Sequence, residues 1–149
     1  MMITRIDKDL LKYKDIYISA YEEIDIQEAS EDSESGMANG LLTISKNDVE
    51  FDIEILFDFD IDIEYDGGES PQWVDYEHYQ FVPYTYIDSV ECKNIKVEQQ
   101  ISEKNFQHLQ KQLGLEKNET KELIEESLKL LMPYYIKLIN AELEIWFEV

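Results

Sequence analysis

Hydrophobic and acidic residues alternate with a period of two along residues 49–66. The odd positions from Val49 to Tyr65 are apolar, and only Leu56 interrupts the acidic even positions. This pattern predicts a β-strand with one buried and one solvated face. Because the strand would exceed the usual length, we expect a bend or bulge near Leu56, and Gly67 and Gly68 to end the strand. The acidic positions, here called the acidic ladder, are Glu50, Asp52, Glu54, Asp58, Asp60, Asp62, Glu64 and Asp66.

The flanking segments have patterns of other kinds. Residues 3–14 place Ile6, Leu10 and Leu11 at helical spacing and predict a short amphipathic helix. Residues 73–82 fit either a helix or a strand. We expect further strands at residues 16–26, 41–45, 84–90 and 93–97, and a loop at residues 28–40, which is rich in Ser, Gly and acidic residues.

The C-terminal third carries helix signals. Ser102 can cap a first helix that Gly114 ends, and a second helix begins near Asn118. The apolar spacing of the second helix continues through Pro133, so we expect a kink there instead of a break. Residues 143–149 fit either helix or strand. The sequence therefore predicts a single α+β domain spanning residues 1–149, with an antiparallel sheet of about four or five strands and C-terminal helices packed on one face.

The charge of the chain is unevenly distributed. The 149 residues include 34 acidic and 13 basic ones, which gives a net charge of −21. Between Asp15 and Glu91 there are 22 acidic residues and one basic residue, Lys46, so this part alone accounts for the net charge. Such a field repels nucleic acid and anionic membranes and attracts basic partners.

The ladder has an electrostatic cost. Alternate residues on one strand face lie about 6.7 Å apart. Two unit charges at that distance repel by about 0.6 kcal/mol in water before salt screening. Acidic residues also keep a protein soluble and protect a sheet edge from aggregation, so the ladder has a structural as well as a functional interpretation. Duplex DNA carries one charge per about 1.7 Å of axis, so DNA mimicry requires acids from neighbouring strands and from the 28–35 segment to converge on the ladder.

The end of the ladder matches a calcium-binding loop only weakly. Asp62, Glu64, Asp66 and Gly67 resemble the opening of an EF-hand loop, but its twelfth position would be Trp73 instead of a bidentate Glu. Side chains on one face of a strand do not wrap around a single ion. We therefore predict no metal site.

A helix-turn-helix match at residues 106–124 is also weak. Gly114 occupies the turn, but Gln110 stands where a small residue is usual. The second helix is mainly acidic, whereas a DNA reader needs basic residues. We predict no direct nucleic-acid binding.

Catalytic and cofactor motifs are absent from the sequence. His78 and His108 have no further ligand at metal-binding spacing, and Cys92 lacks a nucleophile context and suits a small buried position. We find no phosphate-binding Gly-rich loop and no hydrolase signature. We therefore expect a protein that is not an enzyme and holds no cofactor.

Aromatic residues accumulate beside the acids after the ladder, at Trp73, Tyr76, Tyr79, Tyr84 and Tyr86. The simpler interpretation is that they belong to the core. If they are exposed, they supply binding anchors next to a steering field. Trp73 and Tyr76 are therefore candidate partner-binding residues together with the ladder.

These observations favour a non-enzymatic binding protein. We expect it to inhibit a partner by occupying a basic, nucleic-acid-binding surface, as a phage or mobile-element anti-defence protein or DNA mimic does. An immunity protein for a nuclease toxin has the same chemistry. The alternative of another class is a phage or bacterial assembly protein whose acidity serves solubility only. With one cysteine, no signal-peptide pattern and no long apolar run, we expect a cytoplasmic protein without membrane contact. Whether the chain forms a homodimer stays open.

Overall fold

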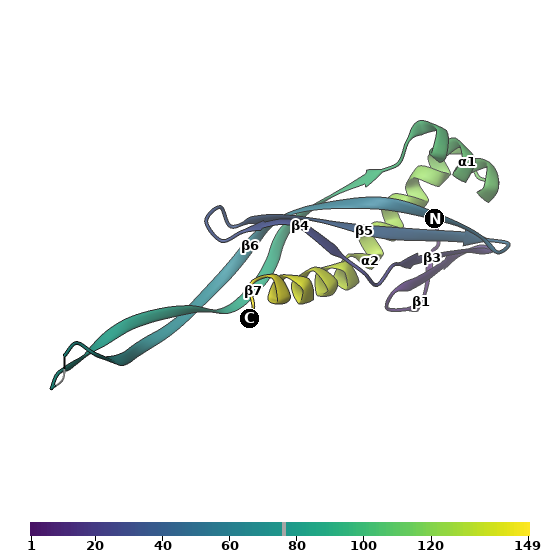
Figure 1. The fold of residues 1–149 in the computed structure, drawn as a ribbon. Helices are drawn as coiled ribbons and strands as arrows, with labels where there is room; N and C mark the ends of the chain where they lie inside the picture. Colours follow the sequence, from purple (N-terminus) through teal and green to yellow (C-terminus); the bar gives the residue numbers. More distant parts are fainter. Residues whose placement is uncertain (76) are drawn as a thin grey trace.

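One antiparallel sheet and two C-terminal helices form the protein in a computed structural model that describes every residue except Tyr76 (Figure 1). The sheet order is β1-β2-β3-β5-β6-β7, and β4 also pairs with β5. This confirms the α+β class, although seven strands exceed the predicted four or five. The strands are β1 (Thr4–Asp7), β2 (Leu10–Tyr13), β3 (Ile16–Ala20), β4 (Asp25–Ser30), β5 (Ser35–Lys46), β6 (Val49–Trp73) and β7 (Tyr79–Gln100).

The predicted helix at residues 3–14 is wrong, because this segment forms β1 and β2. Leu11 and Tyr13 are buried while Leu10 and Lys12 are only half-buried, which is the alternation of a strand. Lys14 has a φ of 53°, and its turn folds β2 onto β3. Pairing with β3 therefore overrides the helical spacing of the apolar residues.

The predicted strand at residues 16–26 is interrupted. β3 and β4 lie one after the other along the same side of β5, and residues 21–24 leave the sheet between them. Ile24 turns inward at this break. A Cβ atom on Gly40 would lie 2.8 Å from Ile24 Cδ1 and 3.0 Å from the ring of Phe57, so glycine leaves room for both side chains.

The predicted loop at residues 28–40 is also wrong. Only residues 31–34 form a turn, and β5 already begins at Ser35. Its small residues face the large side chains of β6. A Cβ atom on Gly36 would lie 2.6 Å from the ring of Phe59. The Gly and Ser composition therefore reflects close packing in the sheet and not a loop.

β6 and β7 form the longest hairpin of the molecule, and its distal part projects beyond the body (Figure 1). β6 pairs with β5 without interruption through Leu56. The irregularity expected near Leu56 occurs against β7, where the register shifts between Asp58 and Asp60, and a second shift follows between Glu64 and Tyr65. Gly67 does not end the strand. A Cβ atom there would lie 2.2 Å from the Tyr84 carbonyl oxygen, so this glycine permits the two strands to approach closely.

The helices agree with the sequence signals. α1 (Glu103–Leu113) begins at Ser102, whose hydroxyl accepts a hydrogen bond from the Asn105 N–H at 3.1 Å, and Gly114 ends it with a φ of 68°. α2 (Lys117–Trp146) continues through Pro133, and Figure 1 shows it bending along its length. The helix extends to Trp146. Residues 143–146, which fit either helix or strand by sequence, are therefore helical.

α2 packs on the face of the sheet that carries the apolar side chains of β6. The ring of Tyr135 contacts that of Phe57 with centroids 5.0 Å apart, and its hydroxyl donates a 2.7 Å hydrogen bond to the Leu41 carbonyl. Asn140 Oδ1 accepts a 2.8 Å hydrogen bond from the backbone N–H of Cys92 on the edge strand β7. The helix thus holds both the centre and one edge of the sheet.

Replacing Tyr135 by Phe tests the contribution of the buried hydroxyl. Burial raises the pKa of this phenol, so the neutral group is the form that donates to Leu41. We expect Tyr135→Phe to lower the free energy of unfolding by about 1 kcal/mol, measured by urea denaturation. Tyr134→Phe serves as a control, because the neighbouring Tyr134 hydroxyl is outside this bond. Equal losses for the two variants would contradict this role.

Candidate interaction surface

The acidic ladder lies on the outer face of β6, opposite the core. Every ladder residue is exposed, while Ile53, Ile55, Phe57, Phe59 and Ile61 between them are buried. The predicted alternation is therefore confirmed, and one strand aligns all eight carboxylates on the side away from α2. Of the aromatic candidates, Trp73 lies at the distal end of β6, and Tyr76 lies outside the described residues.

β5 adds no acidic residue beside the ladder. The β5 residues opposite ladder positions on the outer face are Ser45, Thr43, Leu41, Met37 and Ser35. Thr43 Oγ1 donates a 2.7 Å hydrogen bond to Asp52 Oδ1. The ladder is therefore one row of charge on this side, too sparse by itself to match the phosphates of a duplex.

β7 partly compensates the middle of the ladder. Lys93 Nζ lies 3.7 Å from Asp62 Oδ1, and Asn94 Nδ2 donates a 3.0 Å hydrogen bond to Asp60 Oδ2. Lys96 pairs in register with Asp58. The carboxylates at the two ends of the ladder, residues 50–54 and 64–66, have no lysine opposite them in the register, although β7 also brings Glu91 opposite Asp62.

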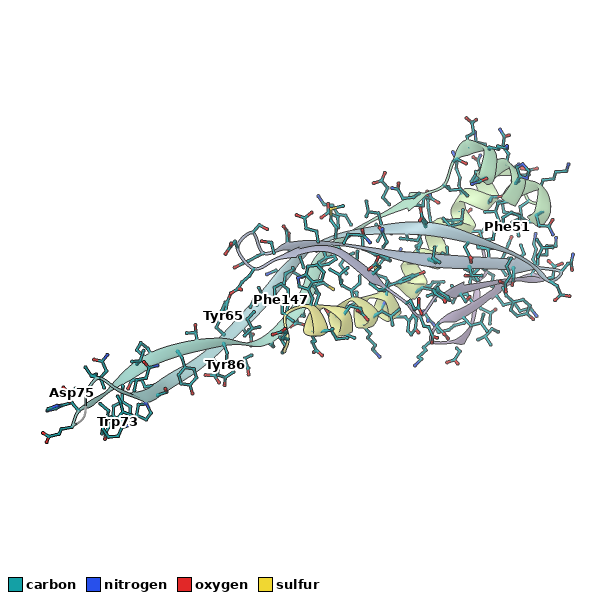
Figure 2. All side chains as sticks on the ribbon, in the orientation of Figure 1. Phe51, Tyr65, Trp73, Asp75, Tyr86 and Phe147 are labelled. Atoms are coloured by element: carbon teal, nitrogen blue, oxygen red, sulfur yellow. The ribbon has the colours of Figure 1, made fainter. Side chains whose placement is uncertain are left out.

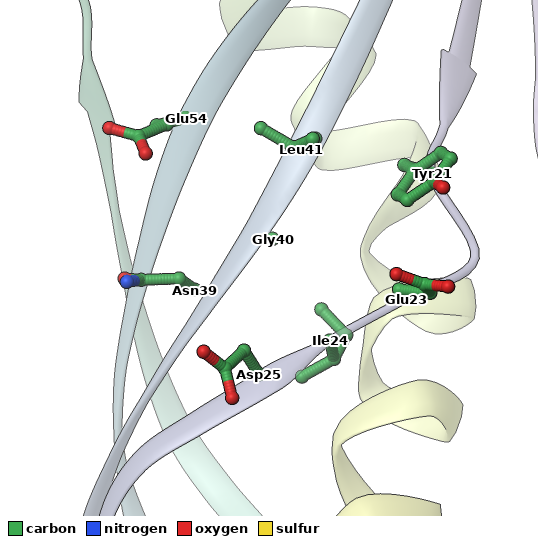
Figure 3. Close-up of a pocket in the computed structure, with 8 residues that line it drawn as sticks. All are labelled: Tyr21, Glu23, Ile24, Asp25, Asn39, Gly40, Leu41 and Glu54. Carbon is green, nitrogen blue, oxygen red and sulfur yellow. The ribbon is translucent and has the colours of Figure 1, made fainter.

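A pocket joins one end of the ladder to neighbouring acids (Figure 3). It opens at the gap between β3 and β4, where residues 21–24 leave the sheet, and has a volume of about 510 Å³. Carboxylates of Glu23, Asp25 and Glu54 line it, together with the apolar side chains of Ile24 and Leu41. Acids from two segments, residues 23–25 and β6, line the same pocket, which the strand pattern of β6 alone does not predict.

The turn between β4 and β5 brings further acids to the other end of the ladder. The Tyr65 hydroxyl donates a 2.7 Å hydrogen bond to Glu31 Oε1. This bond, with the nearby charges of Glu31, Glu34 and Asp32, raises the pKa of Tyr65 to about 12. The 28–35 segment therefore contributes to the acidic surface, as mimicry requires, at the point where the hairpin leaves the body.

Beyond this point β6 and β7 continue as a two-stranded arm, defined here as residues 64–89. Figure 2 shows Tyr65 near the base of the arm and Trp73 and Asp75 near its tip. The large side chains of the arm are exposed, Trp73 by 74% and Phe81 by 58% of their surface. The expectation that Trp73, Tyr79, Tyr84 and Tyr86 belong to the core is therefore wrong, because neither helix reaches the distal arm.

Beyond Tyr65, the exposed aromatic residues that the structure describes in the arm form two groups. Trp73 and Tyr79 are opposite one another with ring centroids 5.6 Å apart, and Tyr79 and Phe81 are also 5.6 Å apart. With Pro71 these residues surround a hollow of about 280 Å³, and we call the four residues the tip cluster. Tyr84 and Tyr86 stack with centroids 6.3 Å apart and an interplanar angle of 19°, and we call them the tyrosine pair.

The turn at the tip is held by Asp75. Its Oδ1 accepts hydrogen bonds from the Glu77 N–H at 3.0 Å, the His78 N–H at 3.0 Å and His78 Nδ1 at 2.8 Å. The bond with His78 is the main reason that the pKa of Asp75 lies below its usual value. His78 is thus a structural residue of the turn.

The remaining candidate residues are structural or solvent-exposed. Cys92 is buried, as predicted, and burial raises the pKa of its thiol to about 11. His108 is exposed on α1. Within the described part of the chain, no group of three or more His, Cys, Asp or Glu side chains is arranged to hold a metal ion.

Titration of Tyr65 tests the link between the arm and the β4–β5 turn. Because the pKa is raised above 10.0, the bond to Glu31 stabilises the folded protein below pH 10 and is lost as the pH rises through about 12. Replacing Glu31 by Gln should move the pKa of Tyr65 back towards 10, measured by ¹³C NMR of the labelled ring carbon. Tyr17 is the comparison residue. An unchanged Tyr65 pKa would show that this contact does not form in solution.

Neither described helix combines the length and apolar character of a membrane span. Comparison with protein-family models, curated proteins and solved structures finds no match to this chain. Its function must therefore be argued from the acidic surface and the arm.

Proposed function

We propose that this protein is a non-enzymatic binding protein that occupies a basic, nucleic-acid-binding surface of a partner protein and thereby inhibits it. The observation that carries the proposal is a continuous exposed acidic face, which runs along β6 from Glu50 to Asp66 and leads onto an arm with exposed aromatic residues. No lysine or arginine occurs between Lys46 and Lys93.

Electrostatic complementarity supports a basic partner. The two ends of the ladder lack the lysines that flank its middle, and each end gathers acids from other segments. Glu54 shares a pocket with Glu23 and Asp25, and the base of the arm lies beside Glu31. Fields of this kind accelerate encounter with a surface of opposite charge and exclude like-charged competitors. A surface built for phosphates has the required sign.

The exposed aromatic residues of the arm favour a binding function over a role in solubility alone. Acidic residues suffice to keep a protein soluble, but they do not require the six exposed aromatic rings that the described residues of the arm carry. A contiguous exposed apolar patch rimmed by polar groups marks an interaction site. Large aromatic side chains also dominate the free energy of many protein interfaces.

Neutralising one end of the ladder tests the proposal. We expect the triple variant Glu50→Gln, Asp52→Asn, Glu54→Gln to lose at least tenfold in affinity for the partner, because three uncompensated charges are removed. The partner is first isolated by affinity capture on the wild-type protein and accepted only if added nucleic acid displaces it. Binding is then measured by calorimetry at low and high salt, and we expect it to weaken steeply with salt.

A matched control uses the compensated middle of the ladder. The variant Asp58→Asn, Asp60→Asn, Asp62→Asn removes the same number of charges, but these lie beside Lys96, Asn94 and Lys93. We expect it to lose less affinity than the first variant. If both variants bind the partner as tightly as the wild type, the ladder serves only solubility and the proposal fails.

A further inference from the structure

The arm combines aromatic rings with carboxylates and carries no positive charge. Residues 64–89 contain six carboxylates and neither lysine nor arginine. The three cation–π contacts in the described part of the chain all belong to the body, where Lys8, Lys12 and Lys14 lie over tyrosine rings. The described rings of the arm thus face solvent, and none of these three lysines lies over them.

Each aromatic group has a carboxylate on its own side of the arm. Glu69, Pro71 and Trp73 alternate along β6 and therefore point to the same side, so Glu69 accompanies the tip cluster. Asp66 is opposite Tyr86 in the register, and the Tyr86 hydroxyl lies 3.5 Å from Asp66 Oδ2. The tyrosine pair therefore also has a carboxylate beside it.

The two groups do not form one flat patch. Register pairs place the tip cluster and the tyrosine pair on alternate sides of the ribbon, and two-stranded ribbons twist strongly. The aromatic rings consequently wind around the arm. A partner that covers both groups must enclose the arm, as a groove or a wrapping segment does.

The edges of the arm are less suited to binding than its faces. Pro71 lies in β6 and Pro83 in β7, and neither has an N–H to donate to an added strand. The two prolines thus make the edges less suited to strand addition and favour contact through side chains.

We infer that the arm is an arginine-recognising element, in which guanidinium groups of the partner stack on the aromatic rings and pair with Asp66 and Glu69. This inference rests on the proposed function and names the chemistry of the partner. A guanidinium group is planar, stacks on aromatic faces and binds a carboxylate through two parallel hydrogen bonds. Lysine offers a compact, strongly hydrated charge that uses such a site less well. Arginine is also a principal residue of nucleic-acid-binding surfaces.

Peptides of equal charge separate arginine recognition from simple attraction. The probes are octa-arginine and octa-lysine, and the protein is the full chain with Trp146→Phe, so that Trp73 is the only tryptophan. We expect octa-arginine to bind about five- to thirtyfold more tightly by calorimetry, from about two stacking contacts, and to change Trp73 fluorescence.

Two arm variants locate the preference. Trp73→Ala with Phe81→Ala should reduce the preference for octa-arginine, because only the tyrosine pair then remains to stack with a guanidinium group. Asp66→Asn with Glu69→Gln keeps the rings and should weaken octa-arginine binding more than octa-lysine binding. This variant tests arginine recognition even if the first variant disturbs the arm. The ladder variant at residues 50, 52 and 54 is the control, and it should weaken both peptides without changing their ratio.

The outcomes separate this inference from the proposed function. Equal binding of both peptides to the wild-type arm would overturn arginine recognition and leave the acidic binding surface in place. Failure of both peptides to bind at low salt would overturn the proposed function as well. A shift of Trp73 emission on neutral phosphatidylcholine vesicles, with no response to octa-arginine, would assign the rings to a lipid surface and reject the inference.

Discussion

The pairing of β6 with both of its neighbours is the constraint on which the rest of the molecule depends. One face of this strand supplies Phe57, Phe59 and the buried isoleucines, so β5 must present small residues such as Gly36 and Gly40 beside them, and α2 must cover the remaining apolar surface. The opposite face is then committed to solvent, because side chains on a strand alternate strictly. The exposure of the ladder residues to solvent is thus a direct consequence of how the core is filled.

The arm forms because β6 and β7 continue to pair beyond the point where β5 ends. Isolated two-stranded hairpins are marginal in water. Here, the Tyr65 bond to Glu31 ties the base, Asp75 orders the tip turn, and contacts between aromatic rings on neighbouring positions support the length between them. These contacts order the rings and still leave much of their surface exposed. Ordered, exposed aromatic side chains lose little conformational entropy on binding and suit an interface.

In the proposed complex, the ladder and the arm would contribute different physical effects to binding. Exposed carboxylates act at a distance and mainly raise the rate of encounter, and salt screens them. Aromatic contact acts only after encounter and mainly lengthens the lifetime of a complex. A continuous path from Glu50 to Trp73 along one strand joins the two effects in a single element. This division accounts for a protein that concentrates charge and exposed rings on the same hairpin.

The sequence by itself determined the local features. The period-two alternation fixed the two faces of β6, Ser102 and Gly114 marked the ends of α1, and the count of acids located the net charge. Only the tertiary structure decided the features that depend on contacts between segments distant in the chain. β1 and β2 replace a predicted helix because β2 pairs with both β1 and β3, and Gly67 lies inside a strand because Tyr84 lies against it. It also placed Lys93 beside Asp62 and left Trp73 outside the core. Composition and periodicity describe what a residue tends to do alone, whereas burial, pairing and charge compensation depend on which strand comes to lie beside it.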